Sequence, residues 1–253
     1  MDLQDKVIVV TGGARGLGFA MAKRLGLHGA KPVIIDLNPQ DIDDAIAKLS
    51  DDGIDASGHV CNVSQEHEVE RCFATIVEQQ GALHGLINNA GMLRDALLVK
   101  VKDGEVVDRM SLQQWNTVID VNLTGVFLCG RSAAEWMIKL KCEGVIINIS
   151  SLSRLGNRGQ TNYSATKAGV AAMSVGWAAE LSRYGIRSAA IAPGFFYTEM
   201  VASMKPEALE AAAAHIPVGR LGDMDEIAKA AQFIFENDYF NGKLIEVDGG
   251  LRG

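Results

Sequence analysis

The sequence predicts an α/β fold, a single Rossmann-type, doubly wound parallel sheet with helices on both faces. Short runs of β-branched and apolar residues such as "VIVV" and "VIINI" alternate with longer stretches of helical pattern. Such near-continuously apolar strands are typical of a sheet that is covered on both faces. The chain has 253 residues, 48% of them hydrophobic, and no linker rich in Pro, Gly or Ser interrupts it. Residues 1–253 are therefore expected to form one domain.

The strand and helix patterns alternate along the chain. Strands are predicted at Val7–Thr11, Val33–Asp36, Gly58–Asn62, Gly85–Asn88, Val145–Ser150, Arg187–Ala192 and Lys243–Val247. Helical patterns include Gly18–Leu27, Gln65–Gln79, Gln113–Leu140, Tyr163–Arg183 and Met224–Phe235. Ligands of such sheets bind beyond the carboxyl ends of the strands, so functional residues are expected there.

A glycine-rich turn follows the first strand and opens the first helix. In "VVTGGARGLG", Val9–Gly18, the glycines allow the backbone to approach a pyrophosphate, whose charge favours the helix N-terminus. Asp36 ends the next strand, roughly 20 residues after the turn, where an acid can accept hydrogen bonds from ribose hydroxyls. The alternative for Asp36 is an ordinary helix N-cap or turn residue.

The same carboxylate favours NAD over NADP, because it repels a 2′-phosphate. No basic residue follows Asp36, where the sequence has Leu37. Arg15 argues in the other direction, since a basic residue in the glycine turn could receive that phosphate. Asp36 is expected to lie at the ribose itself, and we therefore predict NAD(H).

One segment departs from the alternation. "VKVKDGEVVD", Val99–Asp108, alternates apolar and polar residues around an Asp103–Gly104 turn signal. This pattern predicts an inserted β-hairpin before the helix that Ser111 opens. It is interpreted as a solvated excursion, with a substrate rim or a subunit contact as the alternatives.

A second candidate site lies in "TNYSATKAG", Thr161–Gly169. Tyr163 and Lys167 are four residues apart and hence on one face of a helix. A cation near a phenol favours the phenolate and lowers its pKa. A tyrosine tuned in this way can exchange a proton with an alcohol or ketone oxygen while a cofactor moves a hydride.

Charge and composition exclude several classes of function. A net charge of −7 argues against nucleic acid or anionic membrane as the main partner. No apolar run approaches the ~20 residues of a membrane span, and the acidic start "MDLQD" is not typical of a signal peptide. The four cysteines are scattered, so we expect neither a metal site nor a disulfide framework. Free thiols are typical of a reducing compartment, and we therefore expect a cytoplasmic location.

Several motifs in order give the chain a family resemblance. They are "TGGARGLG" (Thr11–Gly18), "NNAG" (Asn88–Gly91), "VNLTGVF" (Val121–Phe127), "NISS" (Asn148–Ser151), Tyr163 with Lys167, and "APGFFYTEM" (Ala192–Met200). Over essentially its whole length the chain resembles the short-chain dehydrogenase/reductase family. The stretches "LRDALL", "GNRGQTNYSATKAGV", "PVGRLG" and "IEVDGG" are similar to its β-ketoacyl reductase branch. That branch includes 3-oxoacyl carrier-protein reductases and 3-hydroxyacyl-CoA dehydrogenases.

The resemblance implies a role for each matching position. Tyr163 would donate the proton in reduction, Lys167 would lower its pKa and bind the nicotinamide ribose, and Asn122 would hold a water that links Lys167 to solvent. For Asn122 the alternative is a local cap or helix bend. The cofactor-binding positions implied are Gly12, Arg15, Gly16, Leu17, Gly18, Asp36, Asn62, Val63, Asn89, Gly91, Tyr163, Lys167, Pro193, Gly194 and Thr198.

A serine would polarise the substrate carbonyl, and two serines compete for this role. Ser151 is the second of the "SS" pair, as in relatives, whereas Ser150 keeps the family spacing of 13 residues before Tyr163. A shortened loop is easier than a register slip in a buried strand, because a slip moves every side chain to the other face. We therefore predict Ser151.

The substrate is less sharply indicated. The stretch Gly194–Pro217 begins with aromatic residues and suits a lid with an apolar wall, which would include Phe195, Phe196, Met200 and Met204. Two positions that are often basic in carrier-protein reductases are Cys142 and Tyr184 here, which favours an acyl-CoA or a small ketone over a carrier-bound acyl group. The resemblance implies 3-oxoacyl or 3-hydroxyacyl thioesters as substrates, acyl carrier protein as a candidate partner, and a homotetramer. Polyols, steroids or small ketones remain as alternative substrates, and a non-catalytic NAD sensor or scaffold remains as an alternative of another class.

Overall fold

The computed structural model describes residues 1–197, 209–210 and 213–251. Seven strands form one parallel sheet in the order β3-β2-β1-β4-β7-β8-β9. They are β1 (Val7–Thr11), β2 (Lys31–Asp36), β3 (Ser57–Val60), β4 (Gly85–Asn88), β7 (Gly144–Ile149), β8 (Ile186–Pro193) and β9 (Leu244–Val247). This confirms the predicted doubly wound sheet, with strand ends within three residues of those expected.

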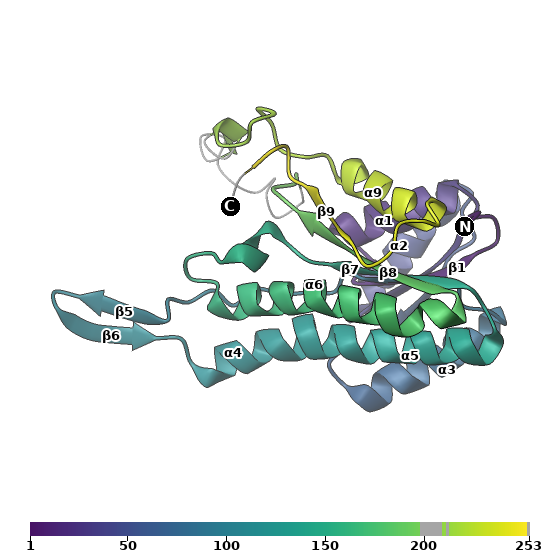
Figure 1. Cartoon of the computed structure of the whole chain (residues 1–253), viewed down its shortest axis with the longest axis horizontal. Helices are drawn as coiled ribbons and strands as arrows, with labels where there is room; N and C mark the ends of the chain where they lie inside the picture. The colour runs from purple at the N-terminus through teal and green to yellow at the C-terminus, as the bar shows by residue number, and fades with distance from the viewer. Residues whose placement is uncertain (198–208, 211–212, 252–253) are drawn as a thin grey trace.

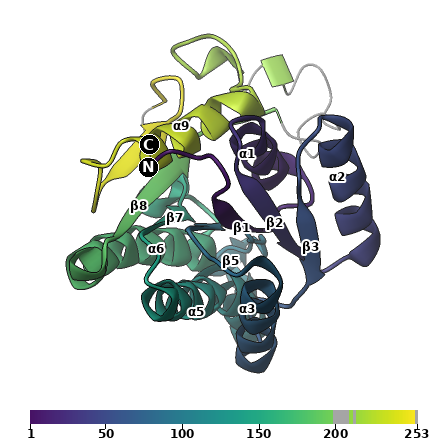
Figure 2. The same ribbon diagram turned by 90° about the vertical axis from the view of Figure 1, so that its right-hand side faces the viewer.

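Helices cover both faces of the sheet. Figure 2 shows α1 (Gly16–Leu27), α2 (Pro39–Asp51) and α9 (Met224–Glu236) on one face. The other face carries α3 (Glu66–Gln80), α5 (Gly125–Leu140) and α6 (Thr161–Leu181) (Figure 2). Right-handed crossovers between parallel strands require this arrangement.

Each face of the sheet has its own hydrophobic core. Side chains alternate along a strand, so Ile8 and Val10 pack with α1 and α9, whereas Val7 and Val9 pack with α3 and α5. The largest fully buried side chains are Phe235 on the first face and Phe73 on the second. From β1 the sheet grows in one direction through β2 and β3, and from β4 it grows in the other through β7, β8 and β9. At such a reversal of strand order a parallel sheet opens a crevice at its carboxyl edge.

The predicted helix Gln113–Leu140 is not regular. It consists of α4 (Leu112–Ile119), a π-helical turn at Asp120–Thr124, and α5. A capping box between Ser111 and Gln114 starts α4. The π-helical turn adds a residue to the helical repeat, and it brings Asn122 fully into the interior.

The predicted hairpin is present as β5 (Val99–Lys102) and β6 (Glu105–Arg109). Asp103 and Gly104 both have positive φ, at 51° and 84°, as a tight hairpin turn requires. The hairpin projects beyond the body of the molecule, continuing the direction of α4 (Figure 1). No helix in the described part of the chain is long and apolar enough to cross a membrane.

Candidate active site

The glycine turn forms an open cradle at the start of α1. Gly12 and Gly16 have positive φ, at 60° and 57°, a conformation that glycine adopts readily. A Cβ on Gly18 would lie 2.2 Å from the Gly12 carbonyl oxygen, so glycine is required for the turn to close on the helix. A Cβ on Gly16 would meet nothing within 4 Å. The backbone therefore presents an uncovered helix N-terminus, where an anion is favoured.

Asn89 holds this turn in place from the end of β4. Its Nδ2 donates hydrogen bonds to the carbonyl oxygens of Thr11, at 3.1 Å, and Gly12, at 2.9 Å. In return, the Thr11 hydroxyl oxygen accepts from the backbone N–H groups of Asn89 and Ala90, both at 3.1 Å. These contacts join the carboxyl ends of β1 and β4 into one rigid edge.

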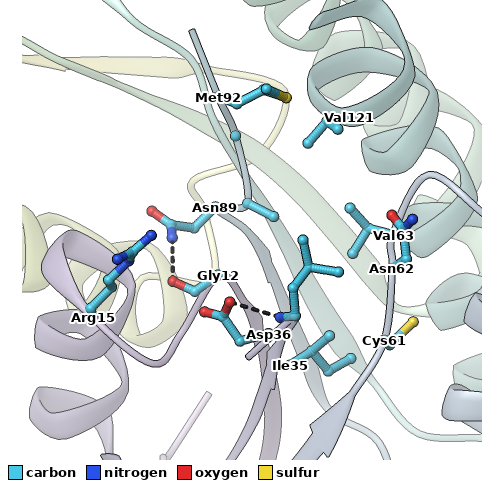
Figure 3. A pocket seen from close by; sticks show the side chains of 13 residues that line it. Gly12, Arg15, Ile35, Asp36, Cys61, Asn62, Val63, Asn89, Met92 and Val121 are labelled. Carbon is cyan, nitrogen blue, oxygen red and sulfur yellow. Dashed lines mark hydrogen bonds between the residues drawn. The ribbon is translucent and has the colours of Figure 1, made fainter. Parts of the chain in front are cut away.

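A cavity of about 410 Å³ opens beside the turn (Figure 3). Its lining brings together seven of the residues predicted to bind the cofactor, which are Gly12, Arg15, Asp36, Asn62, Val63, Asn89 and Gly91. The Asp36 carboxylate accepts hydrogen bonds from the backbone N–H groups of Leu37, at 2.8 Å, and Ala14, at 3.3 Å. Its position at the end of β2 is thus fixed by the turn that it faces.

A second cavity, of about 510 Å³, adjoins the first and shares Arg15, Asn89, Gly91 and Met92 with it. Its remaining lining residues come from the start of α1, from the segment after β4, from the ends of β7 and β8, and from α6. They include Leu17, Arg94, Ser150, Ser151, Tyr163, Lys167, Pro193 and Gly194. One continuous cleft therefore runs along the carboxyl ends of the strands, with Asp36 at one end and Tyr163 at the other.

Tyr163 and Lys167 lie together on α6, with the Lys167 Nζ atom 5.5 Å from the centroid of the phenol ring. The lysine is buried, and its Nζ donates a hydrogen bond to the Ile149 carbonyl oxygen at 2.7 Å. Burial lowers the pKa of the Lys167 ammonium to about 8. The ammonium group is thus held near the phenol by the end of β7 rather than by direct contact with the tyrosine oxygen.

The pKa of Tyr163 is raised in this structure, which is opposite to the expected direction. Burial of the phenol is the main cause, the hydrogen-bonding Ser151 hydroxyl lowers the pKa in part, and the charge of Asp95 raises it. Desolvation of the phenol disfavours the phenolate more than the Ser151 hydrogen bond stabilises it. Without a bound cofactor the Tyr163 phenol therefore keeps its proton and can act as a proton donor.

The two competing serines have different environments. Ser150 is buried, and its hydroxyl donates a hydrogen bond to the Lys167 carbonyl oxygen at 2.7 Å, which ties β7 to α6. Ser151 is half-buried, interacts with the Tyr163 phenol, and accepts a hydrogen bond from the Ser153 N–H at 3.1 Å. Only Ser151 directs its hydroxyl toward the phenol.

The Asn122 side chain binds the main chain of Met92, in the segment that follows β4. Its Oδ1 accepts from the Met92 N–H at 2.8 Å, and its Nδ2 donates to the Met92 carbonyl oxygen at 2.9 Å. Both amide atoms are thus satisfied by the segment above the cleft. The π-helical turn agrees with the alternative of a bent helix.

Sequence reasoning missed Asn162, which is fully buried next to Tyr163. Its Nδ2 donates to the carbonyl oxygens of Arg94, at 3.0 Å, and Gln114, at 3.2 Å. Together with Asn122 it fixes both ends of the segment Met92–Arg94. A lone asparagine at a helix start gives no sequence signal beyond its preference for capping.

The end of β8 supplies the last predicted positions. Pro193 and Gly194 line the second cavity, and a Cβ on Gly194 would lie 2.7 Å from the Asp248 Cα atom. Thr198, Met200 and Met204 lie outside the described residues, as does most of the expected lid. Within the described residues, no group of three or more His, Cys, Asp or Glu side chains could hold a metal ion.

An open helix N-terminus and the Asp36 carboxylate lie along the same cleft as the Tyr163 phenol, at the carboxyl edge of a doubly wound sheet, which is where dinucleotide-binding proteins bind their ligand. The comparisons agree. A family model described as enoyl-(acyl carrier protein) reductase matches residues 12–252. The 3-oxoacyl-(acyl-carrier-protein) reductase FabG of Thermotoga maritima is 37% identical, with 99% of each chain covered.

The chain belongs to the short-chain dehydrogenase/reductase family, whose members use a nicotinamide cofactor. The short-chain reductase protein NovJ of Streptomyces niveus is 37% identical over 98% of this chain and 94% of its own. A crystal structure from Agrobacterium tumefaciens, described as a gluconate dehydrogenase candidate, has a TM-score of 0.88 and 33% identity, covering 99% of this chain and 97% of its own. The predictions of the fold, the family and an oxidoreductase are thereby confirmed.

Proposed function

We propose that this oxidoreductase uses NAD(H) to interconvert 3-oxoacyl and 3-hydroxyacyl thioesters. The observation that carries the proposal is the continuous cleft from Asp36 to Tyr163. A dinucleotide lying in it would have its adenosine ribose at Asp36 and its nicotinamide beside the phenol, where it would supply the hydride.

Each part of the dinucleotide would have its own binding residues in the cleft. The backbone from Gly12 to Gly18, including Arg15, Gly16 and Leu17, would line the pyrophosphate, with Asn62 and Val63 beside the adenine. Pro193, Gly194 and Thr198 would border the nicotinamide. The Lys167 ammonium would bind the ribose hydroxyls.

In the reduction, Tyr163 would donate the proton and Ser151 would bind the substrate oxygen. Ser151 would donate a hydrogen bond to the substrate carbonyl oxygen, and Tyr163 would pass its proton to that oxygen as the alkoxide forms. The raised pKa of the phenol suits a donor. Because both Asn122 amide atoms are bound to Met92, a water that links Lys167 to solvent would have to use the main chain of the π-helical turn.

The preference for NAD rests on Asp36. A 2′-phosphate at its carboxylate would place like charges together, which costs several kcal/mol. Asp36→Ala should therefore raise the ratio of kcat/KM for NADPH to that for NADH at least about tenfold. Arg15→Gln is the matched test of the competing idea. If Arg15→Gln abolishes NADPH use and Asp36→Ala leaves the ratio unchanged, Arg15 rather than Asp36 sets the choice.

The substrate class is supported by the names of the relatives and by one cation. The 3-oxoacyl-(acyl-carrier-protein) reductases act on acyl thioesters of a carrier. Arg94 lines the cavity that contains Tyr163. Within the described residues its guanidinium donates one hydrogen bond, to the Leu93 carbonyl oxygen at 3.4 Å, and pairs with no carboxylate. It is available for an anionic group such as the phosphate of a pantetheine thioester.

The similarity to the structure described as a gluconate dehydrogenase candidate supports a second possible function, that of a reductase of small ketones or polyols. The two are distinguished by turnover of acetoacetyl-CoA, acetoacetyl carrier protein and neutral ketones with both cofactors, followed at the nicotinamide absorbance. Thioester turnover that exceeds that of neutral ketones supports the proposal, and the reverse contradicts it.

A protein of another class, a non-catalytic NAD sensor or scaffold, would bind NADH without turnover. Tyr163→Phe tests the catalytic role. Loss of the general acid should lower kcat by about 10²- to 10⁴-fold, while the Kd for NADH stays within about threefold of the wild-type value. Activity retained in this variant would remove Tyr163 from the mechanism. We also propose a homotetramer in the cytoplasm, on the family resemblance alone.

A further inference from the structure

The hairpin β5–β6 is amphipathic. In the antiparallel register Val101 lies opposite Val106, and Val99 lies two residues from Val101 on the same face. The register shift between Lys100 and Val101 leaves Val107 as the extra residue of a bulge. Val99, Val101 and Val106 make up most of this face, which we call the valine face, and Arg109 lies opposite Val99 at its end.

The opposite face of the hairpin carries paired charges. Lys100 lies opposite Asp108, and Lys102 opposite Glu105. Cross-strand pairs of opposite charge contribute modestly to a sheet. Charged side chains of both signs are also well hydrated, so in the described part of the chain the valine face is the part of the hairpin that lacks a covering surface.

No other part of the described chain buries the valine face. Every residue of both strands is exposed, with 49% of Val99, 59% of Val101 and 65% of Val106 accessible to solvent. A two-stranded hairpin alone is marginally stable in water and needs packing against another surface. Among the described residues these valines have no covering surface, and a second chain is one that could supply it.

The charge of the hairpin favours a second copy of the chain as the covering surface. From Lys100 to Arg109 it carries three cations and three anions, whereas the chain as a whole has a net charge of −7. Two such chains repel each other except through surfaces of balanced charge. An acidic partner such as a carrier protein would instead be attracted to an excess of cations, which the hairpin lacks.

The position of the hairpin also fits a contact between copies. It extends in line with α4 and α5 beyond the body of the molecule (Figure 1). The outer surface of α5 and α6 is grooved by an apolar cavity of about 190 Å³ lined by Phe127, Gly130, Ala134, Trp177 and Leu181, with Arg131 and Glu180. The groove on α5 and α6 and the hairpin beyond α4 thus lie along one run of helix, from α4 to α5.

The area of the hairpin face is small compared with the area that a stable protein interface buries. Five residues at ~3.4 Å each and two strands ~4.8 Å apart give the hairpin a face of roughly 170 Å². A stable interface buries about 800 Å² on each partner. The hairpin alone is too small to hold two chains together, so it would extend a larger contact.

We propose that the hairpin Val99–Arg109 is an arm that packs its valine face against a second copy of this chain, extending a contact made by the outer surface of α5 and α6. The arm strengthens association and contributes nothing to the cleft. This inference does not depend on the cofactor or substrate proposed above, because its readout is the state of association.

The test is sedimentation of the full-length protein over a range of concentrations. Val99, Val101 and Val106 are replaced together by Thr, which has the shape of Val and also favours strands. The concentration at which the assembly is half dissociated should rise at least tenfold. The matched control is Lys100→Gln with Asp108→Asn, which keeps the charge balance and changes only the charged face. It should dissociate at the wild-type concentration.

A second measurement follows the hairpin itself. Its backbone amides should exchange hydrogen more slowly when the wild-type protein is above its association concentration than when it is below. A monomeric wild type, or a threonine variant that associates like the wild type, would overturn the proposal. So would an unchanged assembly in which the variant loses turnover of carrier-protein thioesters but keeps turnover of CoA thioesters, because the arm would then contact the carrier.

Discussion

Single alanine substitutions of Ser151 and Ser150 test their different roles. Ser151 is expected to act on the substrate, whereas Ser150 joins β7 to α6. Ser151→Ala removes the hydroxyl that faces the Tyr163 phenol, together with a cap on the Ser153 N–H. Ser150→Ala removes the buried hydrogen bond to the Lys167 carbonyl oxygen. Each change costs about 1 kcal/mol of stability. Both variants should therefore melt about 2–4 °C below the wild type.

Because the stability losses are matched, the activities can be compared directly. Loss of a hydrogen-bond donor to a developing oxyanion lowers kcat by about 10²- to 10³-fold. We expect this loss for Ser151→Ala and less than a tenfold loss for Ser150→Ala. The assay is steady-state oxidation of NADH with acetoacetyl-CoA, at a temperature well below both melting points.

The pH profile gives an independent readout. In alcohol oxidation the phenolate accepts the proton, so activity rises as pH passes the pKa of Tyr163. Since Ser151 lowers this pKa, Ser151→Ala should move the rise to higher pH, and Ser150→Ala should leave it in place. An equal or larger loss of kcat in Ser150→Ala, with its profile displaced, would refute the assignment and make Ser150 the acting serine.

Two further predictions concern the lysine and the glycine turn. Because the folded pKa of Lys167 is about 8 and its unfolded pKa is about 10.4, the unfolded chain binds more protons between these values. The free energy of unfolding should therefore rise with pH across this window relative to Lys167→Met, as measured by urea unfolding. A constant difference between the two proteins would show that the lysine is not desolvated. Gly18→Ala would place its Cβ 2.2 Å from the Gly12 oxygen and should abolish NADH binding, as followed by fluorescence titration. Gly16→Ala has open space and should cost only the ~1–2 kcal/mol of a left-handed alanine. Equal effects of the two substitutions would contradict the cradle.

The sequence by itself determined the features that depend on local spacing. The apolar runs gave the parallel sheet, since a strand buried on both faces needs apolar side chains in both directions. The spacing of four residues placed Tyr163 and Lys167 on one side of α6, because a helix repeats every 3.6 residues. The glycines and Asp36 came together because parallel strands end at the same edge of the sheet. The Asp103–Gly104 signal was sufficient to predict the hairpin and its turn.

Only the tertiary structure decided the contacts between elements. Whether Ser150 or Ser151 faces the phenol depends on how the end of β7 packs against α6, and spacing along the chain does not fix that packing. The Lys167 Nζ bonds to the Ile149 carbonyl oxygen and the phenol is desolvated, so the direction of the Tyr163 pKa follows from burial rather than from the tyrosine–lysine spacing. Asn122 and Asn162 hold the two ends of the segment Met92–Arg94, from positions 30 and 68 residues away in the chain. Such long-range pairings have no periodic signature, because they are selected by the shape of the packed interior.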